Sequence, residues 1–137
     1  MSTIGYSGTP LAKKLGIKAG YTVLLVNEPS HYLLLFEDMP EVNYVVNPSK
    51  ETVDFIHLFC TDKTDFEKRS LKLKPTLKMT GMLWVSWPKG SSKIETDLSR
   101  DYIREYLLEN GLVDVKVCAV DQDWSGLKFM YRIRDRK

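Results

Sequence analysis

The sequence lacks the short motifs that mark many nucleotide-dependent and hydrolytic enzymes. It contains no GxGxxG, no GxxxxGK[ST] phosphate loop, no GxSxG and no HExxH. The loop after the first predicted strand reads Val-Asn-Glu-Pro-Ser over 26–30 and has no glycine, the residue that lets a backbone approach a phosphate closely. These absences argue against a glycine-loop cofactor site, and the sequence identifies no cofactor and no catalytic residue.

Cysteine and long apolar runs are also scarce. The only two cysteines, Cys60 and Cys118, lie inside apolar segments without zinc-ligand spacing, so we expect buried thiols in a reducing compartment. Apolar runs reach about five residues, far short of the roughly 20 that span a bilayer. The N-terminus has neither the basic start nor the apolar centre of a signal peptide. We therefore expect a soluble, cytoplasmic protein with no membrane partner.

Excess charge of one sign is missing too, with 20 Lys and Arg against 18 Asp and Glu. A dedicated nucleic-acid domain is usually far more basic, so nucleic acid is not an expected partner. One run of five cations could contact phosphates, but it lacks the interleaved aromatic residues of a single-strand binder. A solvated helix face is the more common explanation of such a run. Its members are Lys68, Arg69, Lys72, Lys74 and Lys78.

What is present fits an ordinary folded domain. The 137 residues are 43% hydrophobic and 28% charged, near the averages for globular proteins. A chain of this length buries enough surface to form its own core. We predict a single domain over 1–137, with residues 1–8 loosely ordered and residues 134–137 a frayed tail.

Apolar periodicity predicts strands that alternate with helices. The predicted strands cover residues 22–26, 42–46, 53–60, 82–87, 113–120 and 127–133. The predicted helices cover residues 10–15, 31–36, 63–73 and 97–109. Thr9, Ser30 and Asp97 are the predicted N-caps of the first, second and fourth of these helices. Such alternation indicates an α/β fold in three layers, with a mostly parallel sheet of about six strands and a C-terminal antiparallel hairpin.

The pairing of strands 42–46 and 53–60 stays open. Their link of about six residues is short for a parallel crossover, which usually needs ten or more. Either the two strands form a hairpin, or the link passes over the sheet edge without a helix.

In open α/β sheets, ligands bind outside the carboxyl ends of the strands. That rule selects the loops 27–30, 61–64, 88–93 and 121–126. Asp and Ser at strand ends also make turns and caps, which is the simpler alternative. The candidate ligand-binding residues in these loops are Asn27, Glu28, Asp62, Lys89, Ser91, Ser92, Asp121, Asp123 and Trp124.

Two of these loops suggest particular chemistry. The stretch 88–93 combines Gly, Ser and Lys before a helix and could bind an anion, or could be a solvated loop. Asp121 and Asp123 could hold a cation or act as an acid/base pair, or could accept turn hydrogen bonds while Trp124 packs on the sheet. His31 and His57 have no partner at ligand spacing, so no metal site is predicted, and His57 is expected in the core with one hydrogen bond.

Three stretches resemble a family of short bacterial α/β domains of unknown function. They are Tyr6–Lys18, Leu83–Lys89 and Gly111–Phe129, and the resemblance spans nearly the whole chain. The family brings no known activity or catalytic residues. In outline the predicted strand order, with its closing antiparallel hairpin, is also similar to class I methyltransferases, a Rossmann-like fold. The chain departs from them because it is short and lacks the glycine-rich loop after the first strand.

Two functions remain open at this stage. The absence of a catalytic constellation favours a non-catalytic binding or regulatory domain, with a homodimer or another protein as partner. The polar residues at the strand ends favour the alternative, a binder of a small nucleoside-like ligand or an enzyme that uses the crevice there. Fold likeness alone does not decide between them.

Overall fold

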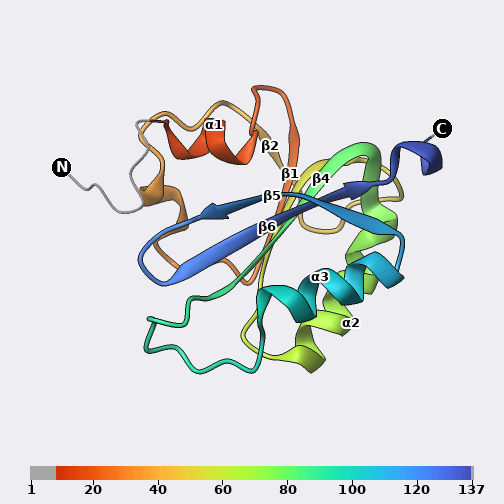
Figure 1. The fold of residues 1–137 in the computed structure, drawn as a ribbon. Helices are drawn as coiled ribbons and strands as arrows, with labels where there is room; N and C mark the ends of the chain where they lie inside the picture. The colour runs from red at the N-terminus through yellow and green to blue at the C-terminus, as the bar shows by residue number, and fades with distance from the viewer. Residues whose placement is uncertain (1–8, 137) are drawn as a thin grey trace.

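The computed structural model describes residues 9–136 and has a six-stranded sheet at its centre (Figure 1). The strand order is β2-β1-β3-β4-β6-β5. The strands are β1 Thr22–Val26, β2 Asn43–Tyr44, β3 Val53–Phe59, β4 Leu77–Pro88, β5 Leu112–Ala119 and β6 Trp124–Tyr131. The helices are α1 Leu11–Leu15, α2 Lys63–Leu73 and α3 Arg100–Glu109, with short 3-10 helices η1 Tyr32–Leu35, η2 Lys74–Thr76 and η3 Ile133–Asp135.

The sheet is mostly parallel with an antiparallel C-terminal pair, which confirms the predicted α/β fold class. β1 is parallel to both β2 and β3, and β3 is parallel to β4. β6 is antiparallel to β4 and to β5. The carboxyl ends of β1, β3, β4 and β5 therefore meet at one edge of the sheet, together with the turn between β5 and β6.

The open question of strands 42–46 and 53–60 is resolved by β1, which lies between them. Val23 of β1 is opposite Tyr44 on one side and Phe55 on the other. All three strands are parallel, so the hairpin alternative is wrong. The link over residues 45–52 crosses β1 without a helix, and the regular crossover helix of a βαβ unit is missing here.

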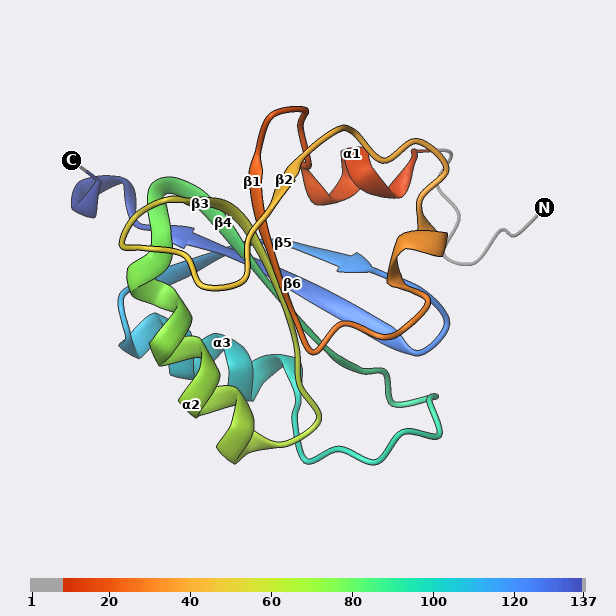
Figure 2. The same ribbon diagram turned by 180° about the vertical axis from the view of Figure 1, so that it is seen from behind.

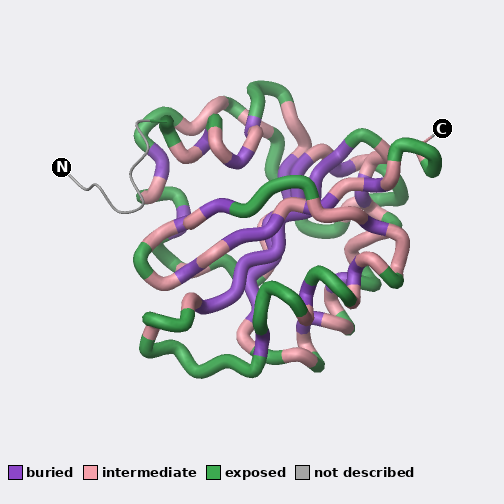
Figure 3. Tube along the Cα trace, in the orientation of Figure 1, coloured by how far each residue is buried: buried purple, intermediate pink, exposed green. Residues whose placement is uncertain are grey.

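Different elements cover the two faces of the sheet (Figures 1 and 2). We call the side under α2 and α3 the helical face; its core includes Phe66 of α2 and Ile103 of α3. We call the other side the aromatic face; there α1 and η1 pack on Phe59 and Trp84. Figure 3 shows the central strands, β3 and the second half of β4, as the most continuously buried part of the chain. Together these observations give the predicted three layers.

Alternation along the strands sends successive side chains to opposite faces. In β3, Phe55 and Phe59 belong to the aromatic face, whereas Ile56 and Leu58 belong to the helical face. Trp84 and Trp87 of β4 also face opposite sides, as their spacing predicted. Both cysteines are free and buried, as expected.

Three predicted helix caps are wrong. The residue that precedes α1 is Pro10, and no side chain caps this helix, so Thr9 does not cap it. The predicted helix after Ser30 is only the 3-10 helix η1, which also has no side-chain cap. α3 begins at Arg100, and its cap is Ser99, whose Oγ accepts a hydrogen bond from Tyr102 N at 3.2 Å. Asp97, the predicted cap, does not cap this helix.

Several predicted strand bounds also need correction. β2 has only two residues, Asn43 and Tyr44, which pair with Thr22 and Val23 of β1. β4 begins at Leu77, five residues before the predicted start, and pairs with β3 from there. β6 begins at Trp124 and ends at Tyr131, whereas the sequence predicted a strand over residues 127–133. The sequence beyond it forms η3 at Ile133–Asp135.

The predicted loose ordering of residues 1–8 lies outside the described residues. Within residues 9–136, the helices are all too short and too polar to cross a lipid bilayer.

Candidate binding site

The sheet edge at the strand carboxyl ends contains a topological switch point. From β1, the chain places β2 on one side and β3 on the other. Ligands of open α/β sheets bind in the crevice where the strand order reverses in this way. The crevice between the ends of β1 and β3 is therefore the first place to examine.

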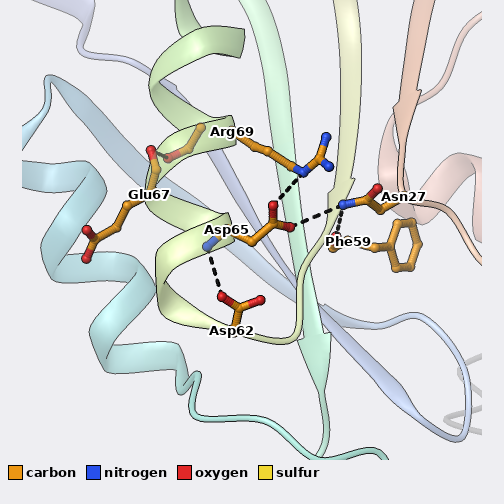
Figure 4. A network of polar contacts seen from close by, with 7 residues as sticks. Asn27, Phe59, Asp62, Asp65, Glu67 and Arg69 are labelled. Atoms are coloured by element: carbon orange, nitrogen blue, oxygen red, sulfur yellow. Dashed lines mark hydrogen bonds and ion pairs between the residues drawn. The ribbon is translucent and has the colours of Figure 1, made fainter.

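In this protein the Asn27 side chain bridges that crevice (Figure 4). Its Nδ2 group donates to the carbonyl oxygen of Phe59 at 3.2 Å and lies 3.4 Å from Oδ2 of Asp65. Asn27 follows β1 directly and has a backbone φ of 58°. Asparagine is one of the few side chains that tolerate this left-handed conformation. The predicted candidate Asn27 thus joins the two strand ends.

Helix α2 holds the partner of Asn27 in place. Asp65 Oδ1 accepts a hydrogen bond from Arg69 Nε at 2.8 Å, one helical turn further on. The Asp65 amide donates to Oδ2 of Asp62, the predicted candidate that caps α2. The sequence analysis missed Asp65 and Arg69 as site residues, although the i, i+4 spacing of opposite charges could have signalled this pair.

The predicted acids of the β5–β6 turn, Asp121 and Asp123, have separate hydrogen-bond partners. Asp121 Oδ1 accepts from the amides of Asp123 and Trp124, at 2.8 and 2.9 Å, while its Oδ2 lies 2.9 Å from His31 Nε2. Asp123 Oδ1 accepts from Ser92 Oγ at 3.0 Å. Each carboxylate has different partners, as the turn alternative predicts. Among residues 9–136, no group of three or more His, Cys, Asp or Glu is placed to hold a metal ion.

The other candidates on this side differ in exposure. Glu28 is exposed in the loop after β1. Trp124 is only 8% exposed, and its ring packs edge-on against Phe59 with the ring centroids 5.0 Å apart. This packing leaves little of the indole surface for a ligand.

An open hollow of about 770 Å³ lies at the carboxyl ends of β3 and β4, next to the crevice that Asn27 bridges. It brings together three predicted candidates, Asp62, Lys89 and Ser92, whereas Ser91 is an exposed neighbour in the same turn. Asn27, Glu28, Asp121, Asp123 and Trp124 lie outside its lining. The lining residues are Thr61, Asp62, Lys89, Gly90, Ser92, Lys93, Ile94, Glu95, Thr96 and Asp97.

Hydrogen bonds fasten the loop that forms most of this hollow. Thr96 Oγ1 donates to the carbonyl oxygen of Thr61 at 2.6 Å, and the Lys63 amide donates to Asp97 Oδ1 at 2.8 Å. Asp97 therefore caps the first turn of α2 and not of α3, where the sequence placed it. At the other end of the loop, the Lys89 amide donates to the carbonyl oxygen of Asp123 at 2.8 Å.

A buried polar chain crosses the aromatic face behind the crevice. Tyr32 Oη lies 2.9 Å from His57 Nδ1, and His57 Nε2 lies 2.7 Å from Ser86 Oγ. His57 thus has two hydrogen-bond partners where the sequence predicted one. Burial lowers the pKa of His57 to about 3, so the ring is neutral at physiological pH. Burial likewise raises the pKa of the Cys60 thiol to about 12, so this thiol is protonated at physiological pH.

No family model matches the chain, and no curated protein matches it. The predicted resemblance to a family of short bacterial domains therefore stays a prediction.

Solved structures do match along most of the chain. A SAM-dependent methyltransferase from Aquifex aeolicus has a TM-score of 0.64 at 18% identity, covering 89% of this chain and 88% of its own. A TehB-like SAM-dependent methyltransferase from Corynebacterium glutamicum has a TM-score of 0.56 at 12% identity, covering 89% and 85%. The ribosomal protein L11 methylase from Lactobacillus delbrueckii subsp. bulgaricus has 0.57 at 13%, covering 89% and 75%. The Rossmann-like, methyltransferase-like fold is thereby confirmed, and identities this low carry the fold alone.

Proposed function

We propose that this chain is a non-catalytic binding domain that holds a small polar ligand in the hollow between the ends of β3 and β4. The observation that carries the proposal is the contrast at the sheet edge. The β1–β3 crevice is bridged by Asn27, while the adjacent hollow is open and has the volume of a small-molecule site.

The residues that line the hollow suit the binding of a ligand better than its chemical conversion. The lining set contains no histidine or cysteine, and Ser92 and Thr96 donate their hydroxyl protons to Asp123 and Thr61. A serine nucleophile needs an adjacent base to remove that proton, and Ser92 has a carboxylate without an intervening imidazole. Ile94, which is 36% exposed, adds an apolar surface against which a nucleoside-like ring could pack.

The proposal is tested by a thermal-shift screen with nucleosides, nucleotides, S-adenosylmethionine, phosphate and divalent metal ions. A ligand at 100 times its Kd adds about 2.7 kcal/mol to the free energy of unfolding. We expect a hit whose stabilisation is lost in Gly90→Phe. A Cβ at Gly90 meets no atom within 4 Å, so this side chain can occupy the hollow without backbone strain.

The matched control is Ser91→Phe, which places the same side chain on the exposed neighbour outside the lining. It should keep the stabilisation. A screen without any hit, or a hit that Gly90→Phe leaves unchanged, would contradict the proposal.

A second candidate is an enzyme that transfers a methyl group from S-adenosylmethionine, favoured by the names of the matching structures. The bridge at Asn27 counts against it. Isothermal titration with S-adenosylmethionine and S-adenosylhomocysteine separates the two candidates. Saturable binding of both that Gly90→Phe does not weaken would favour the enzyme.

A further inference from the structure

The lining of the hollow between β3 and β4 contains charges of both signs. We call Lys89, Gly90, Ser92 and Lys93, which follow β4, the lysine wall. We call Asp62, Glu95, Thr96 and Asp97 the acid wall. Both walls belong mostly to one loop, which leaves β4 and returns to α3.

Each wall is fastened to a different part of the fold. The lysine wall is held at the β5–β6 turn, because the Lys89 amide and Ser92 Oγ both donate to Asp123. The acid wall is held at the end of β3 and the start of α2, through Thr96 to Thr61 and Asp97 to Lys63. The two walls are therefore anchored to different elements, the β5–β6 turn and the start of α2.

The charges of the walls are only partly used inside the protein. Among residues 9–136, no ion pair includes Lys89, Lys93 or Glu95. Asp62 and Asp97 each use one carboxylate oxygen to accept from an amide of the first turn of α2. Two ammonium groups of the lysine wall and carboxylate oxygens of the acid wall remain for a ligand.

We propose that the ligand of this hollow is a small zwitterion, with an ammonium group for the acid wall and a carboxylate or phosphate for the lysine wall. This inference rests on the proposed function and names its ligand class. An anion alone would be repelled by the acid wall, and a cation alone by the lysine wall. A zwitterion gains at both walls and leaves neither charge uncompensated.

The test is an NMR titration of the whole chain with ω-amino acids of increasing length: glycine, β-alanine, 4-aminobutanoate and 6-aminohexanoate. Butylamine and butanoate serve as singly charged probes. We expect amide shifts at Gly90, Lys93 and Asp97. The best-fitting ω-amino acid should have a Kd at least tenfold below that of either singly charged probe.

Two variants assign the two ends of the ligand. Lys93→Met and Glu95→Gln should each raise the Kd of the zwitterion at least tenfold, to the level of a singly charged probe. Lys68→Met and Glu105→Gln make the same changes at exposed positions on α2 and α3 outside the hollow, and should leave the Kd unchanged. Equal Kd values for zwitterion and singly charged probes, or equal effects of lining and control variants, would overturn the inference.

Failure of the inference is distinguishable from failure of the proposed function. If a nucleoside shifts the hollow amides while the ω-amino acids bind no better than butylamine or butanoate, the site stands and the zwitterion is wrong. If no compound in either series shifts these amides, both are wrong.

Discussion

The two faces of the sheet are covered by opposite means. On the helical face, α2 and α3 pack both aliphatic and aromatic side chains onto the strands, and their caps Asp62 and Ser99 satisfy the helix starts. On the aromatic face, α1 has five residues and η1 has four, and neither has a side-chain cap. There, aromatic side chains and the buried hydrogen bonds of His57 cover the sheet in place of a long regular helix. A face with little helix thus depends more on individual side chains.

The largest expected effect is on the aromatic face. Trp84→Ala removes a fully buried indole and its hydrogen bond from Nε1 to the carbonyl oxygen of Leu15 at 2.8 Å. We expect the free energy of unfolding to fall by about 4 kcal/mol, measured by urea denaturation. Leu34→Ala, at a side chain that is 85% exposed, should change it by less than about 0.5 kcal/mol. A loss below about 2 kcal/mol for Trp84→Ala would mean that this face is loosely packed.

The second largest effect is a pH dependence of the free energy of unfolding, which comes from His57 on the aromatic face. Because the pKa of His57 is about 3 in the folded protein and 6.5 in the unfolded chain, the unfolded state binds the extra proton between these values. Stability from this group is therefore full above pH 6.5 and falls as the pH decreases toward 3. We expect a loss of about 1.4 kcal/mol per pH unit between about pH 6 and pH 4. Urea denaturation across this range should show a flatter slope for His57→Gln, and an equal slope would refute the assignment.

A smaller effect is expected when His57 loses one partner. Tyr32→Phe removes the hydroxyl group but keeps the ring that packs on Phe59. The buried Nδ1 atom of His57 is then unsatisfied, at a cost of about 2 kcal/mol. Ser86→Ala should have a similar cost at Nε2. Chemical denaturation of the two single variants and the double variant gives their coupling, and costs below about 0.5 kcal/mol would show that water replaces the lost partners.

The smallest effect compares the helix starts. Ser99→Ala should cost about 1 kcal/mol, because it removes the cap of α3. Thr9→Ala should be neutral, because α1 has no side-chain cap although the sequence places a good one there. Thermal denaturation of both variants is sufficient. A loss of stability in Thr9→Ala would show that this threonine caps α1 in solution.

Much of the fold was predictable because strand and helix patterns are local. The strand 22–26 and the helix 63–73 agree with β1 and α2 residue for residue, since a buried β-branched run and an amphipathic segment are strong signals. The pairing around β1 was not predictable. Residues 45–52 contain no helix, so nothing local distinguishes a parallel crossover from a hairpin link.

For the candidate site, the position of the hollow follows from the sequence but its contacts do not, and ligand binding there stays a prediction. The rule of the strand ends located the hollow that contains Asp62, Lys89 and Ser92. It could not indicate that Asn27 turns back to Phe59, because that contact joins residues 32 positions apart. Nor could it assign Asp97, which has the residue type and spacing of a cap for the helix that follows it but caps α2.

Because Asp97 caps α2, hydrogen exchange at one amide reports the opening of the loop that lines the hollow. The Lys63 N–H group belongs to α2, yet its acceptor belongs to the segment that surrounds the hollow. Whenever the loop lifts away, this N–H group loses its acceptor and its hydrogen exchanges with solvent. The exchange rate at Lys63 would therefore record how often the loop opens, even when no ligand is known.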